Sequence, residues 1–234
     1  MARGRSQYSR AVIALVVVMT AAFAVQLAGV LEGGDWALHA NAFVAAWGEV
    51  TTGGGGPESW RTLSTLWAYA LVHGGVEHLG YNLVFLWLFG SLVHDAVGER
   101  GVLVSALVTT ATAGLLFTFR HLGETPDGVI GCSGLGSGLA GVYVLLAFRW
   151  SEMPRAHAWP LARPVPPMQA AAFAILFVIG DLFLLRSNDG TAHDAHLGGF
   201  GGGLLLAMIL TTFFPTWRSF LGSKVAPEGL AERR

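Results

Sequence analysis

The chain has 234 residues, of which 53% are hydrophobic and only 12% are charged. Soluble globular proteins carry about 25% charged residues, so this composition excludes most soluble classes, together with disordered, collagen-like and coiled-coil chains. The formal net charge of -1 and the absence of a basic cluster argue against a nucleic-acid partner. The single cysteine, Cys132, leaves no intramolecular disulfide and no CxxC metal or redox pair. The composition predicts an integral membrane protein.

Six apolar segments follow one another along the chain, each close to the ~20 residues that cross a bilayer. We expect membrane-spanning helices at residues 11–31, 75–93, 102–119, 133–150, 168–185 and 195–214. Three arginines precede the first segment, but its apolar run is longer than that of a typical signal peptide, so we expect a retained span. Residues 63–72 are also apolar but too short to cross, which favours an interfacial or re-entrant segment. The sequence therefore predicts an all-α, six-span membrane domain over residues 11–214.

The basic residues are divided unequally between the two sides of the expected domain. Of the 14, only Arg61, Arg120 and Arg186 fall in loops on the side opposite the N-terminus. Because positive charge is retained on the cytoplasmic side, we expect cytoplasmic tails at residues 1–10 and 215–234. We expect the protein to be a multi-pass protein of the plasma or inner membrane.

Polar groups inside the expected spans are few, and each is a functional candidate because burying it in a bilayer is costly. They comprise His73, Glu77, His78 and Asn82 at the second span, Cys132, Ser133 and Ser137 at the fourth, Asp181 in the fifth, and His193, Asp194 and His196 at the sixth. Even-numbered spans begin at the outer face in this topology. We therefore expect three of these clusters to converge at one depth, in a site that opens toward the extracytoplasmic side.

Ser133 and His196 are the residue types of an activated nucleophile and its base. In this interpretation His196 takes the proton of Ser133 as the serine attacks a carbonyl, and then returns it to the leaving amine. His78 and Asn82 are four residues apart on one helical face, and with the backbone N–H of Ser133 they would stabilise the oxyanion. Small residues let membrane helices approach closely, so we expect Ser133 Oγ within hydrogen-bond reach of His196.

No carboxylate is clearly placed to orient His196. Asp194 is two residues away and lies on another face of the helix. Asp181 and His193 we interpret as structural. The sequence therefore predicts a catalytic dyad.

Three motifs, in this order along the chain, resemble those of the rhomboid family of intramembrane serine proteases. They are HxxxN with a preceding histidine at His73, His78 and Asn82, GxSG at residues 131–134, and a last-span histidine followed by glycine at His196 and Gly199. The resemblance runs from about residue 60, where Trp60 and Arg61 match a pair often found in the family, to residue 214. Six spans is the count of its minimal prokaryotic members.

The resemblance implies a hydrolase, a serine endopeptidase that cleaves single-span membrane protein substrates in or near the lipid bilayer. Ser133 would be the nucleophile and His196 the base, with His78 and Asn82 at the oxyanion. The family performs this intramembrane proteolysis without a metal or a cofactor.

We also expect structural support from three glycines of these motifs, Gly131, Gly134 and Gly199. Two positions depart from the family pattern. Ser137 stands where many bacterial members have an aromatic residue stacked on the histidine, so His196 would be held by a different partner or less firmly. His94 and Asp95 stand where an acidic residue commonly follows the second span, which puts its cytoplasmic contact in doubt.

Other functions remain open at the level of the sequence. The first alternative is a catalytically silent rhomboid-like protein that binds membrane clients. The second is a specialised protease of the same family that processes proteins with a C-terminal sorting segment. A small-molecule or haem carrier would use the outer-face histidines instead. His193 and His196 are three apart and could share a metal, but no third ligand is evident.

Overall fold

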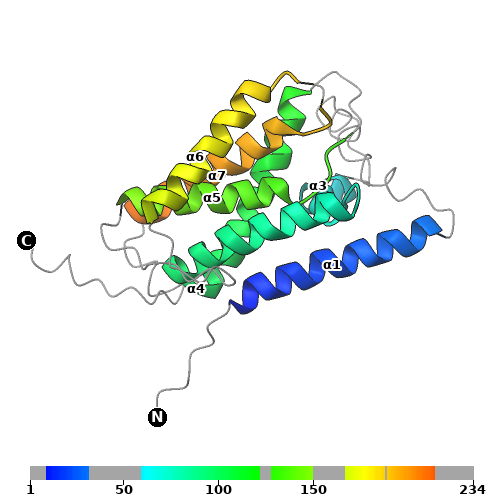
Figure 1. The fold of residues 1–234 in the computed structure, drawn as a ribbon, viewed down its shortest axis with the longest axis horizontal. Coiled ribbons are helices and arrows are strands. Elements are labelled where there is room, and N and C mark those ends of the chain that lie inside the picture. Colours follow the sequence, from blue (N-terminus) through cyan, green and yellow to red (C-terminus); the bar gives the residue numbers. More distant parts are fainter. Residues whose placement is uncertain (1–8, 32–58, 122–127, 150–166, 188, 214–234) are drawn as a thin grey trace, which may run out of the picture.

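The computed structural model describes residues 9–31, 59–121, 128–149, 167–187 and 189–213, and all of its elements within these ranges are helical (Figure 1). The elements are α1 (Arg10–Leu31), α3 (Ser59–Ala68), the 3-10 turn η1 (Tyr69–Leu71), α4 (Val76–Arg120), α5 (Ser133–Arg149), α6 (Pro167–Leu184) and α7 (His193–Phe213). The expected all-α class is confirmed. The short apolar stretch at residues 63–72 forms part of α3 and η1.

Helix α4 is two helices joined at a kink. Gly98 has non-helical backbone angles (φ 79°, ψ -177°) and separates a first limb, residues 76–97, from a second limb, residues 99–120. The second limb returns toward the start of the first, because Trp67 Nε1 donates to the carbonyl of Leu107 over 2.8 Å and the Tyr69 hydroxyl donates to the carbonyl of Thr110 over 2.9 Å. The two limbs correspond to the second and third expected spans.

Within the described ranges, three helices are long and apolar enough to cross a bilayer: Arg10–Gly29, the two-limbed Val76–Arg120, and His193–Phe213. Ser133–Arg149 and Ala171–Leu184 are shorter apolar helices. Helix α5, with 17 residues, falls short of the ~20 residues of a full crossing.

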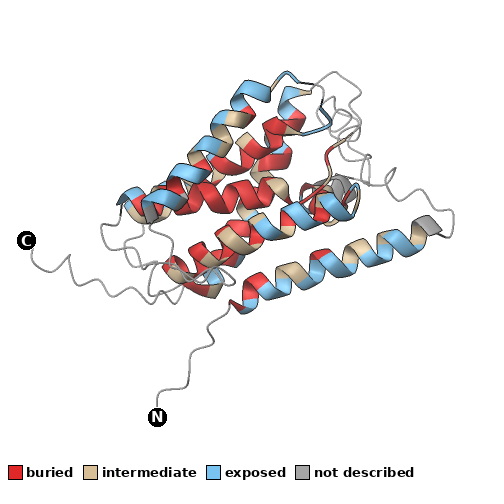
Figure 2. Ribbon diagram, viewed as in Figure 1, coloured by how far each residue is buried: buried red, intermediate tan, exposed pale blue. Residues whose placement is uncertain are grey.

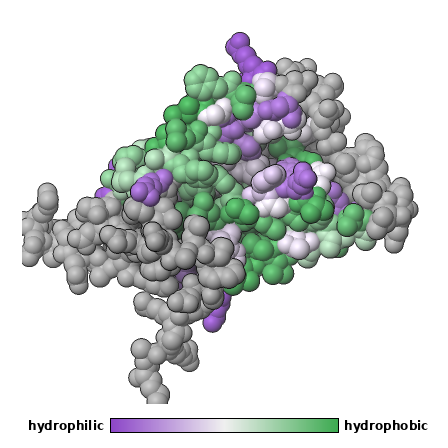
Figure 3. All heavy atoms as spheres, viewed as in Figure 1, coloured by the Kyte–Doolittle hydropathy of each residue, from purple (hydrophilic) through white to green (hydrophobic). Residues whose placement is uncertain are grey.

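Helix α5 forms the centre of the bundle, and almost all of its side chains are buried (Figure 2). It packs between α4 and α7, while α6 lies against α5 and α7, and α1 lies outside along α4 (Figure 1). The outer surface carries large apolar side chains, among them Val17 (59% exposed), Val25 (59%) and Phe183 (85%), and apolar residues cover much of the described surface in Figure 3. A surface of this kind suits lipid rather than water.

Helices α5 and α7 run in parallel and begin at the same end. The backbone at Gly134 packs against Ala195 and Gly199 near their starts. At the other end, Arg149 Nη1 donates to the hydroxyls of Thr211 and Thr212, each over 3.1 Å.

The first limb of α4 begins at this end as well. His78 lies beside Gly131, just before α5, and eleven residues further along α4 the ring of Phe89 lies 6.5 Å from the ring of Tyr143. The polar starts of three helices are therefore brought together at one end of the bundle.

A carboxylate just after His94 and Asp95, that of Glu99, contacts the start of α1. Its carboxylate accepts the N–H groups of Arg10 (3.0 Å) and Ala11 (2.8 Å) and the hydroxyl of Ser9 (2.8 Å). His94 Nε2 lies 3.2 Å from the same carboxylate. Glu99 follows the kink at Gly98, so this cap on the start of α1 could not be placed from the motif position alone.

Candidate active site

The segment before α5 is held by hydrogen bonds to the residues around η1. The N–H of Gly131 donates to the carbonyl of Tyr69 over 3.1 Å, and the N–H of Cys132 donates to Nε2 of His73 over 3.4 Å. Helix α5 then begins at Ser133. Ser133 therefore lies in the first turn, where backbone N–H groups have no intrahelical acceptor.

His73 and Cys132 are both buried between helices, and burial fixes their protonation. Burial, together with neighbouring His78, lowers the pKa of His73 to about 4, so at neutral pH its ring is uncharged and Nε2 can accept a hydrogen bond. Burial raises the pKa of the Cys132 thiol to about 12. Because the thiolate is the nucleophilic form of cysteine, Cys132 is unsuited to act as a nucleophile beside Ser133.

Two side-chain nitrogens of α4 lie against the backbone of Gly131. Gly131 has a positive φ of 100°, and a Cβ at this position would lie 2.6 Å from Nε2 of His78 and 3.0 Å from Nδ2 of Asn82. Glycine fits both the backbone conformation and the close approach. The two nitrogens therefore lie beside Gly131, which precedes Ser133 by two residues.

Both nitrogens are hydrogen-bond donors. Nδ1 of His78 accepts the N–H of Gly74 over 3.2 Å, which leaves the ring proton on Nε2. Asn82 is buried, and its Nδ2 has no partner among the described residues. Buried donors without an acceptor are rare in folded proteins. A pair of donors beside the start of a helix matches the donors that stabilise a developing oxyanion.

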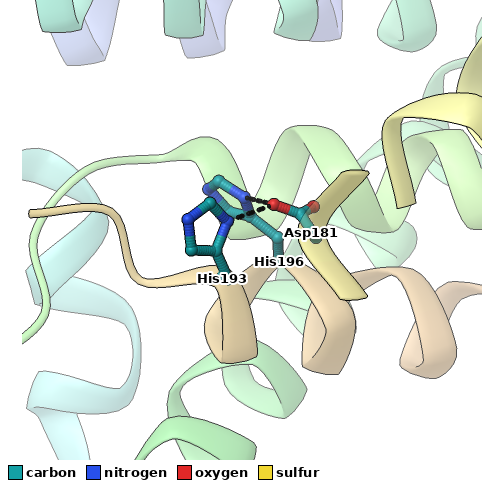
Figure 4. A group of neighbouring side chains, drawn as sticks. All are labelled: Asp181, His193 and His196. Carbon is teal, nitrogen blue, oxygen red and sulfur yellow. Dashed lines mark hydrogen bonds and ion pairs between the residues drawn. The ribbon is translucent and has the colours of Figure 1, made fainter. Parts of the chain in front are cut away.

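The ring of His196 is held by two side chains of α6. Asp181 Oδ1 lies 2.9 Å from Nδ1 of His196 (Figure 4), and the ring of Phe177, one turn earlier, lies 5.6 Å from the imidazole ring. The sequence showed no carboxylate clearly placed to orient His196, but the structure places the carboxylate of Asp181, interpreted there as structural, in contact with its ring. Ser137 supplies no aromatic ring, and Phe177 provides one from another helix.

Asp181 also contacts His193. Nδ1 of His193 lies 2.7 Å from the same Oδ1 (Figure 4), and Nε2 lies 3.1 Å from Oδ2 of Asp189. Two hydrogen bonds lower the pKa of Asp189 to about 2: the larger effect comes from the N–H of Thr191 and the next from the side chain of His193. This exposed carboxylate is therefore ionised. Because carboxylate oxygens only accept, both ring nitrogens of His193 act as donors.

Asp181, His193 and His196 are also residue types that bind metals, and their three nearest ligand atoms lie within 4.8 Å of one another. The sequence showed no third metal ligand beside the two histidines, and the structure places the carboxylate of Asp181 where a third ligand would be. The N–O separations of 2.7 and 2.9 Å are nevertheless those of charge-assisted hydrogen bonds. The cluster is accounted for by hydrogen bonding.

Ser133 and His196 lie on neighbouring helices, but no hydrogen bond joins Ser133 Oγ to the imidazole ring in the part of the chain that the structure describes. The helices touch through glycine: a Cβ at Gly199 would overlap the carbonyl of Gly134, and one at Gly134 would lie 3.4 Å from the carbonyl of Ala195. His196 is also near enough to His78 for the two rings to interact electrostatically. Hydrogen bonds between nucleophile and base are often long before substrate binds.

The sequence marked Asp181 as a functional candidate, but its contact with His196 was not predicted. An ionisable residue within an apolar span is a functional candidate by default, and Asp181 is buried in such a helix. Trp60 and Arg61 lie in the first turn of α3, but their side chains are outside the described part.

A family model described as the Rhomboid domain matches residues 57–213, about two thirds of the chain. The protein therefore belongs to the rhomboid family of integral membrane proteins. Rhomboid protease GlpG of Pectobacterium atrosepticum is 31% identical over 150 residues, covering 63% of this chain and 47% of the relative.

Two further relatives show the same extent of similarity. Rhomboid-like protein 11, chloroplastic, of Arabidopsis thaliana is 31% identical over 146 residues, covering 60% of this chain and 50% of the relative. Rhomboid protease GlpG of Yersinia pseudotuberculosis is 28% identical over 151 residues, covering 63% and 47% respectively. The chain spans about half the length of the curated relatives it matches.

Proposed function

We propose that this rhomboid-family protein is an intramembrane serine endopeptidase that cleaves single-span membrane proteins. The observation that carries the proposal is the pair of donors His78 Nε2 and Asn82 Nδ2 beside the segment that leads into Ser133, the second of which has no acceptor among the described residues. The two GlpG relatives, each named a rhomboid protease, support the same activity.

In the proposed reaction Ser133 Oγ attacks the scissile carbonyl while His196 Nε2 takes its proton. The carbonyl oxygen becomes an oxyanion, which the backbone N–H of Ser133 and the side chains of His78 and Asn82 stabilise. His196 then donates its proton to the leaving amine, and water hydrolyses the acyl-enzyme by the same steps. No step needs a metal or a cofactor.

We further propose that the protein crosses the membrane six times, through α1, both limbs of α4, and helices α5 to α7. The apolar outer surface and the three long candidate spans support this topology. With eleven of the 14 basic residues on one side, the tails at residues 1–10 and 215–234 face the cytoplasm; of these tails the structure describes only Ser9 and Arg10. The site then opens toward the extracytoplasmic side of the plasma or inner membrane.

The test is cleavage of a model single-span substrate by purified protein reconstituted in liposomes. Ser133→Ala and His196→Ala should each abolish cleavage, because each removes a reacting group. Ser137→Ala is the matched control: it makes the same change one turn further along α5, at a buried hydroxyl with no partner among the described residues. It should keep cleavage within about threefold of the unmodified protein, because removing an unpaired buried hydroxyl breaks no hydrogen bond.

Equal cleavage by the unmodified protein and Ser133→Ala would disprove this mechanism. Absence of cleavage for several substrates, together with no labelling of Ser133 by a fluorophosphonate, would favour the catalytically silent alternative. A chromophore that copurifies and is lost on replacing the outer-face histidines would instead support a carrier.

A further inference from the structure

We infer that Asp181 is a positioning residue that holds His196 as the Nδ1–H tautomer, so that the proposed dyad acts as a triad completed from α6. This inference rests on the proposed function, which assigns His196 the role of base. Its structural basis is the contact between Asp181 Oδ1 and Nδ1 of His196, at 2.9 Å.

The contact fixes where the ring proton lies. An ionised carboxylate can only accept, so Nδ1 of His196 is the donor of this bond. In a neutral ring, Nε2 then carries a lone pair, which is the form a general base needs. Without such a partner the two tautomers compete, and a ring protonated on Nε2 cannot take the serine proton.

Asp181 is suited to this role by its environment. It is 4% exposed, and its bonds to His196 and His193 have the lengths of charge-assisted hydrogen bonds. His193 donates to the same oxygen and is itself anchored through Nε2 to Asp189. The carboxylate is thus held by a second, independent donor while it orients His196.

The same helix also places an aromatic ring beside His196. Phe177 precedes Asp181 by one helical turn, and its ring lies 5.6 Å from that of His196 at an interplanar angle of 37°. Two positions of α6, one helical turn apart, therefore lie against the His196 ring, one at Nδ1 and one through a tilted aromatic pair. Helix α6 takes over the support that an aromatic residue at position 137 would otherwise give.

The test compares Asp181→Asn with Asp194→Asn, two isosteric changes at buried carboxylates near the start of α7. Asp194 contacts Arg120, His121 and the N–H of Ala195, and no contact with His196 is present among the described residues. Asp181→Asn should lower kcat between about 10- and 10⁴-fold, because the amide can also stabilise the wrong tautomer. KM should change by less than about threefold, and Asp194→Asn should leave both constants within about threefold of the unmodified protein.

A second readout does not depend on activity. In ¹⁵N-histidine-labelled protein at mildly alkaline pH, the His196 signals are identified by their loss in His196→Gln. The unmodified protein should show a protonated Nδ1 and a bare Nε2, and Asp181→Asn should populate the opposite tautomer. Thermal unfolding in detergent checks that both variants remain folded.

An Nε2–H tautomer in the unmodified protein, or an Asp181→Asn variant with unchanged tautomer and unchanged kcat, would overturn the inference. A protein that neither cleaves substrate nor is labelled at Ser133 would instead reject the proposed function, and the tautomer measurement would still decide the role of Asp181. The two failures are therefore distinguishable.

Discussion

At the scale of single residues, the candidate site contains a buried polar group that has no partner among the described residues. Asn82 is 6% exposed, and its Nδ2 donor has no acceptor among the described residues. A donor in this state costs the folded protein free energy, typically about 1–3 kcal/mol. Such a cost is expected where a group is kept for the transition state rather than for stability.

Asn82→Leu should therefore separate activity from stability. We expect kcat for a single-span substrate to fall by about 10²–10³-fold, the usual loss for one oxyanion donor. The midpoint of thermal unfolding in detergent should stay equal or rise, since the change removes an unpaired amide and nearly conserves side-chain volume. Unchanged kcat, or a lowered midpoint that explains the loss of activity, would argue against this role for Asn82.

At the scale of elements, the contact between α5 and α7 determines whether Ser133 and His196 meet. The carbonyl of Gly134 packs directly on Gly199, and four residues later the carbonyl of Gly138 packs on Gly203 in the same way. Small residues at this spacing allow membrane helices to approach until their backbones touch. Any added side chain at this interface must push the two helices apart.

Gly199→Ala should lower both stability and activity. Its Cβ would overlap the carbonyl of Gly134, so the helices must separate, at a cost of about 1–3 kcal/mol in the free energy of unfolding. Gly201→Ala is the matched control on the same helix, because a Cβ there has no other atom within 4 Å. Unfolding midpoints and cleavage rates of the two variants test this prediction, and equal behaviour would contradict it.

At the scale of the whole molecule, α1 lies outside the bundle formed by the other long helices and is attached mainly along α4 (Figure 1). Its N-terminus is held by Glu99, which follows the kink of α4 and accepts two backbone N–H groups of α1. A carboxylate at a helix N-terminus satisfies unpaired donors and complements the helix dipole. Glu99 therefore links the packing of α1 to the junction of the two limbs.

Glu99→Gln should weaken this attachment. Losing the charge of the cap is expected to reduce the free energy of unfolding by about 1 kcal/mol. Asp95→Asn is the control, because its carboxylate lies on the same stretch of α4 and contacts His94 at 3.5 Å instead of the start of α1. Thermal unfolding in detergent at pH 7 should rank the Glu99 variant below the control, and the reverse order would count against the cap.

The sequence alone determined the positions of the helices, the end of the bundle where their polar residues meet, and the family. The apolar segments predicted the helices to within a few residues, because hydropathy and helix length depend only on local composition. Their alternation predicted that the polar starts of three helices would meet at one end, and the structure places His78 and Asn82 against Gly131, two residues before Ser133. The family followed from three motifs of a few residues each, and the match over residues 57–213 confirms it.

Only the tertiary structure decided which side chains support His196. Asp181 and Phe177 lie in a helix that is apolar almost all round, so no periodic pattern in the sequence shows which face turns toward α7. That face is set by how α6 packs on α5 and α7, a property of all three helices together. For the same reason the cap by Glu99 depends on the kink at Gly98, which places the carboxylate beside a segment about 90 residues earlier in the chain.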